Sequence, residues 1–406
     1  MYTLRQEAQE IESSLISIRR KLHANAEIAF NEVQTAKFIA ETLKSLPGFQ
    51  VYENIGKTGV VGILRGKNDR PCIALRADMD ALPLTEAITD INAAFVSHNA
   101  GAMHACGHDG HVSMLLNFAK IIAPRAHELY GSLKFVFQPA EENGAGAEAM
   151  LKDNVLTIGD LDIDAFYGIH LWSGLKVGEC ISMPGPIMAG GDFFYLTVNG
   201  HGSAPHQTVD SIVVASHLVT ALQTVVSRNI DPLKGAVLSI GKISAGTVAN
   251  AIAASATLDG TMRFFDPAIG KILKTRLHEV CEGVAKTFKA TIEIKYVDLF
   301  PPTINHPGPA NLVYQSLSKI VGPSNIKDDR VMGSEDFSRF LHERPGSFFF
   351  VGCALPDGLD RPHHSPIFAV DERSLMVGTS VWLQLVEDLM VSGQGRNVTG
   401  QKKPNL

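Results

Sequence analysis

The chain has no surplus of positive charge. Its 406 residues include 36 lysines and arginines against 42 aspartates and glutamates, which gives a net charge of -6 and a pI near 6.2. Proteins that bind nucleic acid or an anionic membrane surface usually carry a basic stripe or patch. We therefore expect a small-molecule partner, with no nucleic acid and no membrane.

Cysteine is scarce, and long apolar runs are absent. The five cysteines are odd in number and widely scattered, so a disulfide framework is not expected and reduced thiols are the default. The N-terminal segment has the pattern of a charged amphipathic helix rather than of a signal peptide, and no segment approaches the length of a membrane span. These absences favour a cytoplasmic protein, in which a cysteine stays available to bind metal.

The apolar residues that are present suffice for a large core. Hydrophobic residues make up 45% of the sequence, and a chain of this length usually forms more than one domain. Up to residue 186, short apolar runs alternate with helical patterns, an order typical of α/β proteins. The alternation resumes near residue 299. We expect 1–186 and 299–406 to form one catalytic, metal-binding domain with a mixed, largely parallel sheet covered by helices.

The segment between these parts has a different order of elements. It predicts a strand over 193–200, a helix over 211–227, two strands near 235–244 and 256–264, a helix over 267–288 and a strand over 291–296. Strand, helix, two strands, helix and strand is the order of an α+β unit of the ferredoxin-like kind. We expect 187–298 to be an inserted lid domain whose long helix and exposed strand edge mediate a homodimer or higher oligomer.

The run CGHDGH, which starts at Cys106, is the most informative motif. Two adjacent acidic residues, Glu141 and Glu142, and two isolated histidines, His170 and His364, follow it. Thiolate, imidazole and carboxylate are the ligands that hold zinc and related transition metals, and a second glutamate beside a ligating one can act as a base. The combination indicates a hydrolytic metal site.

Several of these residues follow short apolar runs that look like buried strands. The runs 72–75, 133–137 and 165–169 each end where polar side chains begin. Because open α/β sheets bind ligands outside the carboxyl ends of their strands, we expect these side chains to meet in one crevice. They are Asp78, Asp80, Glu141, Glu142 and His170.

Simpler interpretations exist for some of the candidates. Glu141 and Glu142 are also compatible with a solvated helix start, since acidic residues favour the first turn. His104 and His111 are expected to be structural, each with one backbone partner, and His23 is expected to pack between helices. The strand pattern before the two glutamates favours catalysis over the helix-start interpretation.

Seven distinctive segments occur in order over nearly the whole chain. They are ALRADMDALPLTE, MHACGHDGHVSMLL, FQPAEENGAGAEAM, YGIHLW, NGHGSAPH, VMGSEDF and HHSPIFAVDE. Together they resemble the amidohydrolase branch of the dinuclear metallopeptidase family, which contains aminoacylases, hippurate hydrolases and auxin-conjugate hydrolases. One departure is the sequence HANAE, where Ala26 replaces the usual proline, a change confined to a helix-entry turn.

The resemblance implies a site for two divalent metal ions per subunit, with Glu141 as general base and Cys106 bridging the ions. His363 and His364 are adjacent and point in different directions, and the family pattern favours His364 as the ligand. Thiolate and imidazole suit zinc, nickel or cobalt, and relatives are also served by manganese. The five ligands would be Cys106, His108, Glu142, His170 and His364.

Further roles are expected around the metals. His201, on the inserted domain, could donate a hydrogen bond to the oxyanion when that domain closes, within one subunit or across an interface. Asp80 is expected to hold a metal-bound imidazole from behind. By resemblance, Asn250 and Arg263 bind a substrate carboxylate, although a strand-edge charge explains Arg263 equally well. The remaining substrate-binding candidates, near the mouth of the site, are Ser334 and Glu335.

We therefore expect a metal-dependent amidohydrolase that removes the acyl group from an N-acyl amino acid. A dipeptidase or carboxypeptidase, or an N-acetyl-diaminopimelate deacetylase, would use the same metals and base with a different pocket. A binding protein with a structural metal is the alternative from another class, but such a site has no use for an uncoordinated glutamate. A redox or nucleophilic role for Cys106 is less favoured, because no second cysteine lies nearby in the sequence.

Overall fold

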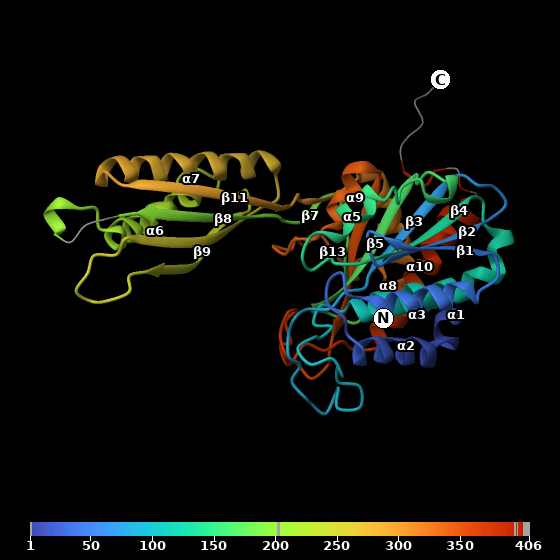
Figure 1. The fold of residues 1–406 in the computed structure, drawn as a ribbon. Helices are drawn as coiled ribbons and strands as arrows, with labels where there is room; N and C mark the ends of the chain where they lie inside the picture. The colour runs from blue at the N-terminus through green and yellow to red at the C-terminus, as the bar shows by residue number, and fades with distance from the viewer. Residues whose placement is uncertain (1, 201–203, 394, 396, 401–406) are drawn as a thin grey trace, which may run out of the picture. The chain divides into compact units, whose positions relative to one another are not determined.

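The computed structural model describes residues 2–200, 204–393, 395 and 397–400. The chain forms two compact units (Figure 1). Unit 1 consists of Met1–Ile187, Ile304–Asp329 and Asp336–Leu406, and unit 2 of Met188–Thr303 and Arg330–Glu335. The second segment of unit 2 was not part of the predicted insertion, 187–298. It belongs there because the Ala189 amide donates hydrogen bonds to the carbonyls of Val331, at 3.1 Å, and Gly333, at 3.0 Å.

Unit 1 is built on an eight-stranded sheet. Its order is β1-β2-β4-β3-β5-β14-β6-β13, and the neighbours β4, β3, β5 and β14 run parallel. The remaining pairs are mixed, so the predicted mixed, largely parallel sheet is confirmed. The strands are β1 (Phe49–Ile55), β2 (Gly59–Arg65), β3 (Cys72–Asp78), β4 (Ser132–Gln138), β5 (Ala165–Lys176), β6 (Cys180–Ile181), β13 (Ile326–Lys327) and β14 (Gly346–Ala354).

Helices cover both faces of this sheet, which is why its central strands are buried along their length. In Figure 1, α2 and α3 lie on one side of the sheet, and α5 and α9 lie on the other. The helices of unit 1 are α1 (Gln6–Glu10), α2 (Glu12–Ala24), α3 (Val33–Lys44), α4 (His108–Ile122), α5 (Gly146–Lys152), α8 (Pro307–Val321), α9 (Phe337–Glu343) and α10 (Arg373–Val386).

The C-terminal helix corrects one expectation from the sequence. Helix α10 continues into a π-helical turn (Glu387–Val391), and together they form a 19-residue stretch long and apolar enough, by length and composition alone, to cross a membrane. The expectation that no segment approaches this length was wrong, because polar residues such as Gln384 interrupt the apolar run in the sequence. The stretch is 72% buried, with Val381 and Trp382 in the core of unit 1.

Unit 2 has the predicted ferredoxin-like order of elements. Its four-stranded antiparallel sheet has the order β11-β8-β10-β9, and α6 and α7 pack on one face of it. Asp210 caps α6, and Asp266 caps α7 ahead of Pro267, so both predicted helices begin where the sequence indicated. The elements are β8 (Gly190–Asn199), α6 (Ser211–Ser227), β9 (Ala236–Ala245), β10 (Ser255–Phe264), α7 (Pro267–Phe288) and β11 (Thr291–Phe300).

Two short strands, β7 (Gly185–Met188) and β12 (Thr303–Asn305), lie at the points where the chain crosses from one unit to the other.

Within unit 2, alternate residues of β8 and β10 point into a core shared with α6 and α7. Phe194, Leu196 and Leu258 are members of this core. The other face of the sheet carries polar residues such as Thr197 and Asp259, so only one face contributes to the core among the described residues.

Candidate metal centre

The parallel strands of unit 1 bring the predicted side chains to one edge of the sheet. Asp78, the last residue of β3, pairs with Gln138, the last residue of β4. Arg76 on β3 pairs with Gly168 on β5. Asp78 and His170 each follow two residues later on the same two parallel strands, so they lie at the same level of the sheet. His170 was expected at a strand end, but β5 continues to Lys176, because its outer half pairs with β14. The register, not the strand end, brings His170 to the site.

A left-handed glycine delivers the first two candidate ligands. Gly107, between Cys106 and His108, has φ +89°, a conformation that residues with a Cβ rarely adopt. Helix α4 starts directly after it, so His108 occupies the first helical position and not a loop. The CGHDGH motif lacks an apolar pattern, so the start of this helix inside the motif could not be read from the sequence.

The five predicted ligands form two groups that share one residue. Cys106, His108 and His170 offer ligand atoms within 4.8 Å of one another, and so do Cys106, Glu142 and His364. The Cys106 Sγ lies 3.5 Å from His170 Nε2, and His364 Nε2 lies 3.3 Å from Glu142 Oε2. Cys106 belongs to both groups, so its Sγ lies within 4.8 Å of a ligand atom of each of the other four residues.

Hydrogen bonds at Nδ1 of His108 and His170 leave the Nε2 nitrogen of each ring for a metal. His108 Nδ1 donates to the Asp80 carbonyl at 2.9 Å, and His170 Nδ1 donates to the Leu171 carbonyl at 2.6 Å. A neutral imidazole that donates from Nδ1 has its lone pair on Nε2. Among the described residues, His108 Nε2 and Glu142 Oε1 are buried without a hydrogen-bond partner, so this donor set fits a metal centre.

The electrostatics of the site favour a cation. Burial raises the pKa of Glu142 to about 7, and the neighbouring Asp80 and Asp78 add to the effect. Burial alone would lower the pKa of His108, but Asp78 and Asp80 outweigh it and raise the pKa to about 10. Burial disfavours the negative charge of Glu142, and the buried carboxylates favour a positive charge at His108, so a divalent cation would be stabilised among these groups.

His111 is a structural residue, as expected. Its Nδ1 donates to Asp78 Oδ1 at 2.5 Å, and its Nε2 accepts the Leu171 amide at 2.8 Å. The second oxygen of Asp78 accepts from Arg76 Nη1 at 2.7 Å. His111 and Asp78 therefore form hydrogen bonds with one another, with the Leu171 amide and with Arg76.

His104 differs from its expectation. Neither of its ring nitrogens has a hydrogen-bond partner among the described residues, and burial lowers its pKa to about 4. The predicted single backbone partner is wrong because His104 lies in the loop before α4 and not in the helix.

Asp80 and Glu141 stand beside the candidate ligands. The Asp80 carbonyl holds His108, and Asp80 Oδ2 accepts the Glu142 amide at 3.1 Å, so Asp80 contacts two predicted ligands. Glu141 is buried and forms a further group with His108 and Glu142, again with ligand atoms within 4.8 Å.

Of the adjacent histidines, His364 forms a ligand group with Cys106 and Glu142. Its backbone is left-handed, with φ +62°, and its amide donates to the Ala105 carbonyl at 2.9 Å. His363 instead contacts the Leu171 carbonyl through Nε2, at 3.0 Å, and Ser173 through Nδ1, at 3.1 Å. The two side chains diverge as predicted for neighbours in the chain.

The predicted substrate-binding residues belong to unit 2. Arg263 and Ser334 lie together, since a Cβ on Gly191 would come within 2.8 Å of both Arg263 Nη1 and Ser334 Oγ. Burial lowers the pKa of Arg263. Glu335 is buried, and its carbonyl accepts from Thr303 Oγ1 at 3.4 Å.

Asn250 lies apart from Arg263. It is exposed in the loop before β10, whereas Arg263 lies near the far end of that strand. At about 3.3 Å per residue, the strand alone separates them by roughly 25 Å, so one chain cannot bring both to one small carboxylate. His201, the predicted oxyanion donor, lies outside the described residues.

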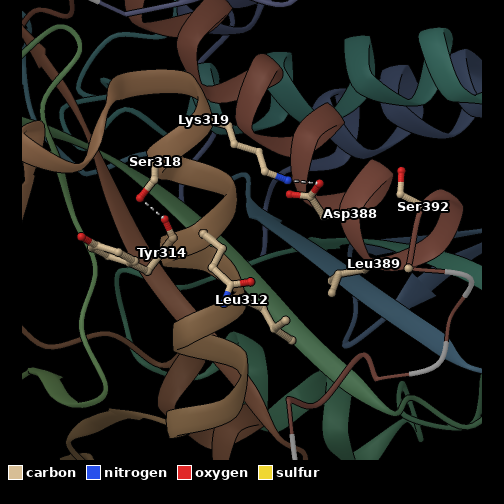
Figure 2. Close-up of a pocket in the computed structure, with 9 residues that line it drawn as sticks. Leu312, Tyr314, Ser318, Lys319, Asp388, Leu389 and Ser392 are labelled. Carbon is tan, nitrogen blue, oxygen red and sulfur yellow. Dashed lines mark hydrogen bonds and ion pairs between the residues drawn. The ribbon is translucent and has the colours of Figure 1, made fainter.

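A surface pocket of about 610 Å³ lies beside α8 and the π-helical turn (Figure 2). Tyr314, Ser318, Lys319 and Asp388 are among its lining residues. Lys319 Nζ donates to Asp388 Oδ1 at 2.6 Å, so the opposite charges neutralise one another. None of the predicted site residues lines this pocket.

Comparison with known proteins identifies the class. The sequence profile described as peptidase family M20/M25/M40 matches residues 74–388. A thermostable carboxypeptidase 2 of Saccharolobus solfataricus is 39% identical over 92% of this chain and 95% of its own length. An N-acetyl-L-cysteine deacetylase of Bacillus subtilis is 35% identical over 98% of this chain and 94% of its own.

A solved structure agrees with these relatives. The YXEP protein of Bacillus subtilis, a dinuclear metal-binding peptidase of the M20 family, is 32% identical, with a TM-score of 0.80 over 93% of this chain and 98% of its own. Fold, donor set and similarity together define a metal-dependent hydrolase that acts on amide bonds. The chain belongs to peptidase family M20/M25/M40.

Proposed function

We propose that the protein hydrolyses the amide bond of N-acyl amino acids, releasing a carboxylate and a free amino acid. The observation that carries the proposal is the pair of ligand groups sharing Cys106, with Glu141 beside the ligand Glu142. The deacetylase among the relatives supports an N-acyl substrate, while the carboxypeptidase keeps a peptide substrate as the second candidate.

The proposed ligands of two divalent ions are Cys106, His108, Glu142, His170 and His364. When bound, such ions polarise a carbonyl and lower the pKa of a water molecule. Glu141 takes a proton from the attacking water and delivers it to the leaving amine. The water oxygen forms the new bond to the carbonyl carbon as the C–N bond breaks, so the acyl group leaves as a carboxylate.

Unit 2 is proposed to bind the rest of the substrate. Arg263, with Ser334 beside it, offers a guanidinium suited to the carboxylate of an amino acid. Glu335, next to Ser334, is proposed to lie at the mouth of the site, and His201 is proposed to donate to the oxyanion. If Asn250 binds the same substrate as Arg263, the two come from different subunits, because β10 separates them within one chain.

A homodimer through unit 2 would meet this requirement. The exposed apolar residues of unit 2 include Ile212, Val213, Ile243 and Val248. Light scattering tests the proposal. Ile212→Glu should shift the dimer to a monomer, whereas Ile88→Glu, an equally apolar exposed site on unit 1, should not. A dimer that survives Ile212→Glu and Val213→Glu together would contradict an interface at α6.

The metal is proposed to be zinc, manganese, nickel or cobalt, since each accepts these ligands. We also propose a reducing, cytoplasmic location, supported by five cysteines that form no disulfide in the part of the chain that the structure describes.

The function is tested with a substrate panel of N-acetyl amino acids, hippurate, indoleacetyl conjugates, dipeptides and N-acetyl-diaminopimelate. Metal-free, zinc-loaded and manganese-loaded protein are compared, and the released amino acid is measured by chromatography. We expect metal-dependent release from N-acyl amino acids. Release from dipeptides alone would establish a peptidase, release from N-acetyl-diaminopimelate alone a deacetylase of that substrate, and no release with any metal would favour a metal-containing binding protein.

The base is tested with Glu141→Gln, which keeps the shape of the side chain. We expect kcat to fall by about 100- to 10,000-fold while the metal content stays the same. Glu148→Gln, which changes a half-exposed glutamate on α5, is the control and should retain activity. Full activity of Glu141→Gln would exclude its role as the base.

A further inference from the structure

Ala140, the residue before Glu141, has a backbone conformation that its side chain disfavours. Its φ is +51°, in the left-handed region, where a Cβ approaches the following carbonyl oxygen. Ala140 is completely buried between β4 and the two glutamates of the candidate site. Such a conformation persists only where the surroundings enforce it, and it is common at functional sites.

A buried glutamate far away in the sequence holds this residue. Glu32 has no exposed surface, and its Oε1 accepts the Ala140 amide at 2.9 Å. Its other oxygen accepts from Thr58 Oγ1 at 2.6 Å. The Ala140 carbonyl accepts from the Gly146 amide at 3.0 Å, so both polar groups of this alanine are fixed. Glu32 thus anchors the turn through one backbone amide.

The chain is closely packed on both sides of this turn. A Cβ on Gly146 would come within 1.6 Å of the Pro139 carbonyl, so the chain on either side of Ala140 is in close contact. The Glu142 amide donates to Asp80 Oδ2 at 3.1 Å, which fixes the backbone that follows Ala140. The direction in which Glu141 and Glu142 leave the sheet therefore depends on the left-handed backbone of Ala140.

We propose that Glu32 is a positioning residue for the catalytic carboxylates, holding Ala140 in the left-handed conformation that aims Glu141 and Glu142 into the metal centre. The inference rests on the proposed roles of these two glutamates. Glu32 acts through a backbone amide and touches neither substrate nor metal ligand. The competing explanation is that Glu32 only fills buried space and bonds Thr58.

The two explanations differ in what a glycine at position 140 should do. Glycine adopts positive φ without the cost that a Cβ imposes. If Glu32 acts by enforcing this conformation, Ala140→Gly should compensate for the loss of Glu32. If Glu32 matters only for packing, a glycine 108 residues away should restore nothing.

The test uses Glu32→Ala alone and combined with Ala140→Gly in the full-length, metal-loaded protein. For Glu32→Ala we expect kcat to fall about 10- to 100-fold, as for a small misplacement of reacting groups, with KM nearly unchanged. Zinc affinity, measured by competition with a chromophoric chelator, should fall about tenfold because Glu142 moves too. Ala140→Gly should restore about fivefold or more in both quantities.

Two controls keep the test specific. Glu32→Gln retains an acceptor for the Ala140 amide and should keep most of the activity. Lys289→Gly relieves a left-handed residue, φ +53°, at the end of α7 in unit 2, and should not rescue Glu32→Ala. Thermal unfolding of each variant identifies a protein that does not fold.

Three results would overturn the proposal: wild-type kcat and zinc affinity in Glu32→Ala, no rescue by Ala140→Gly in a folded double variant, or equal rescue by Lys289→Gly. Failure of the proposed function gives a different result, since the wild-type protein would then be inactive on the whole substrate panel. The zinc affinities and their rescue would still report on the position of Glu142.

Discussion

The hydrogen bonds of each imidazole decide which histidines can bind metal. His170 gives its Nδ1 proton to a backbone carbonyl and turns Nε2 toward Cys106. His111, whose ring centroid lies 4.6 Å from that of His170, has both nitrogens engaged by Asp78 and a backbone amide. Two histidines in one cluster therefore have different chemistry, and that difference resides in the partners of single atoms.

Replacing His111 with phenylalanine tests its structural role. The change leaves Asp78 Oδ1 and the Leu171 amide buried without this partner, so the free energy of unfolding of the metal-free protein should fall by roughly 3 kcal/mol. Metal affinity should fall about 10- to 100-fold, because Leu171 also holds His170. Denaturant unfolding and metal titration measure the two effects.

His170→Ala is the comparison for this prediction. It removes a proposed ligand, so it should abolish binding of one ion while changing the unfolding of the metal-free protein less than His111→Phe does. Unchanged stability of metal-free His111→Phe would contradict the structural role.

The residue types of the site could be predicted from the sequence, but their partners could not. Cys106 and Glu142 stand out because thiolates and paired carboxylates after apolar runs are characteristic of metal sites. Glu32 has no such signal, since an acidic residue just before a helix is common for electrostatic reasons alone. Its hydrogen bond to Ala140 spans 108 residues of sequence and exists only in the folded chain.

Among the elements, α2, α4 and the loop after β3 are joined through one histidine. His23 on α2 bonds Asp109, in the first turn of α4, through Nδ1 and Glu86, in the loop, through Nε2, each at 2.8 Å. Glu86 also accepts the Ser97 amide at 2.8 Å, which closes the loop on itself. His23 was expected to pack between helices. In the structure it also bonds two carboxylates, one of them Asp109 on α4, the helix that carries His108.

This bridge predicts a pH dependence of stability. Burial and Arg19 lower the pKa of His23, but Asp109 and Glu86 outweigh them, so its pKa lies above the usual 6.5. The folded protein thus binds this proton more tightly than the unfolded chain does. The stabilisation is complete below pH 6.5 and is lost as the pH rises through the raised pKa.

We therefore expect His23→Gln to lower Tm most at pH 6 and progressively less toward pH 9. Thermal unfolding of the metal-free protein at these pH values measures the effect, with His127→Gln, a change of an exposed histidine, as control. A Tm difference that is the same at both pH values would mean that His23 contributes only by packing.

Element boundaries were predicted well where local signals exist. Helices α6 and α7 begin after capping aspartates, and the predicted ranges, 211–227 and 267–288, match the observed ones. Strand β5 is longer than its apolar run, because pairing with β14 extends it to Lys176. Such an extension depends on a distant partner strand and cannot be read locally.

For the whole molecule, all five proposed metal ligands belong to unit 1. Removing the metal with a chelator should therefore loosen unit 1 and leave the core of unit 2 unchanged. The stabilisation by bound metal is about 4 kcal/mol when the free metal concentration is 1,000 times Kd.

Hydrogen exchange with mass spectrometry measures this difference by segment. We expect faster exchange on chelation in 105–111 and 139–146, with 255–264 of β10 as the internal control. Equal acceleration in both units would contradict the confinement of the metal centre to unit 1.

We predicted an inserted domain from a change in the order of elements along the sequence, because each architecture has its own pattern of strands and helices. The contribution of Arg330–Glu335 to unit 2 could not be predicted this way. That short segment has no element of its own, and it joins unit 2 through backbone hydrogen bonds to Ala189.

The pairing of β5 with β14 has a consequence for synthesis on the ribosome. All of β5 leaves the exit tunnel before the continuous part of unit 2, Met188–Thr303, and that part is complete before Gly346–Ala354 of β14 is made. Because a central strand of unit 1 lacks its neighbour until then, unit 2 can fold first on the growing chain. A chain that stalls before β14 would carry a folded insert on an unfinished sheet, and such nascent chains are expected to be substrates for chaperones.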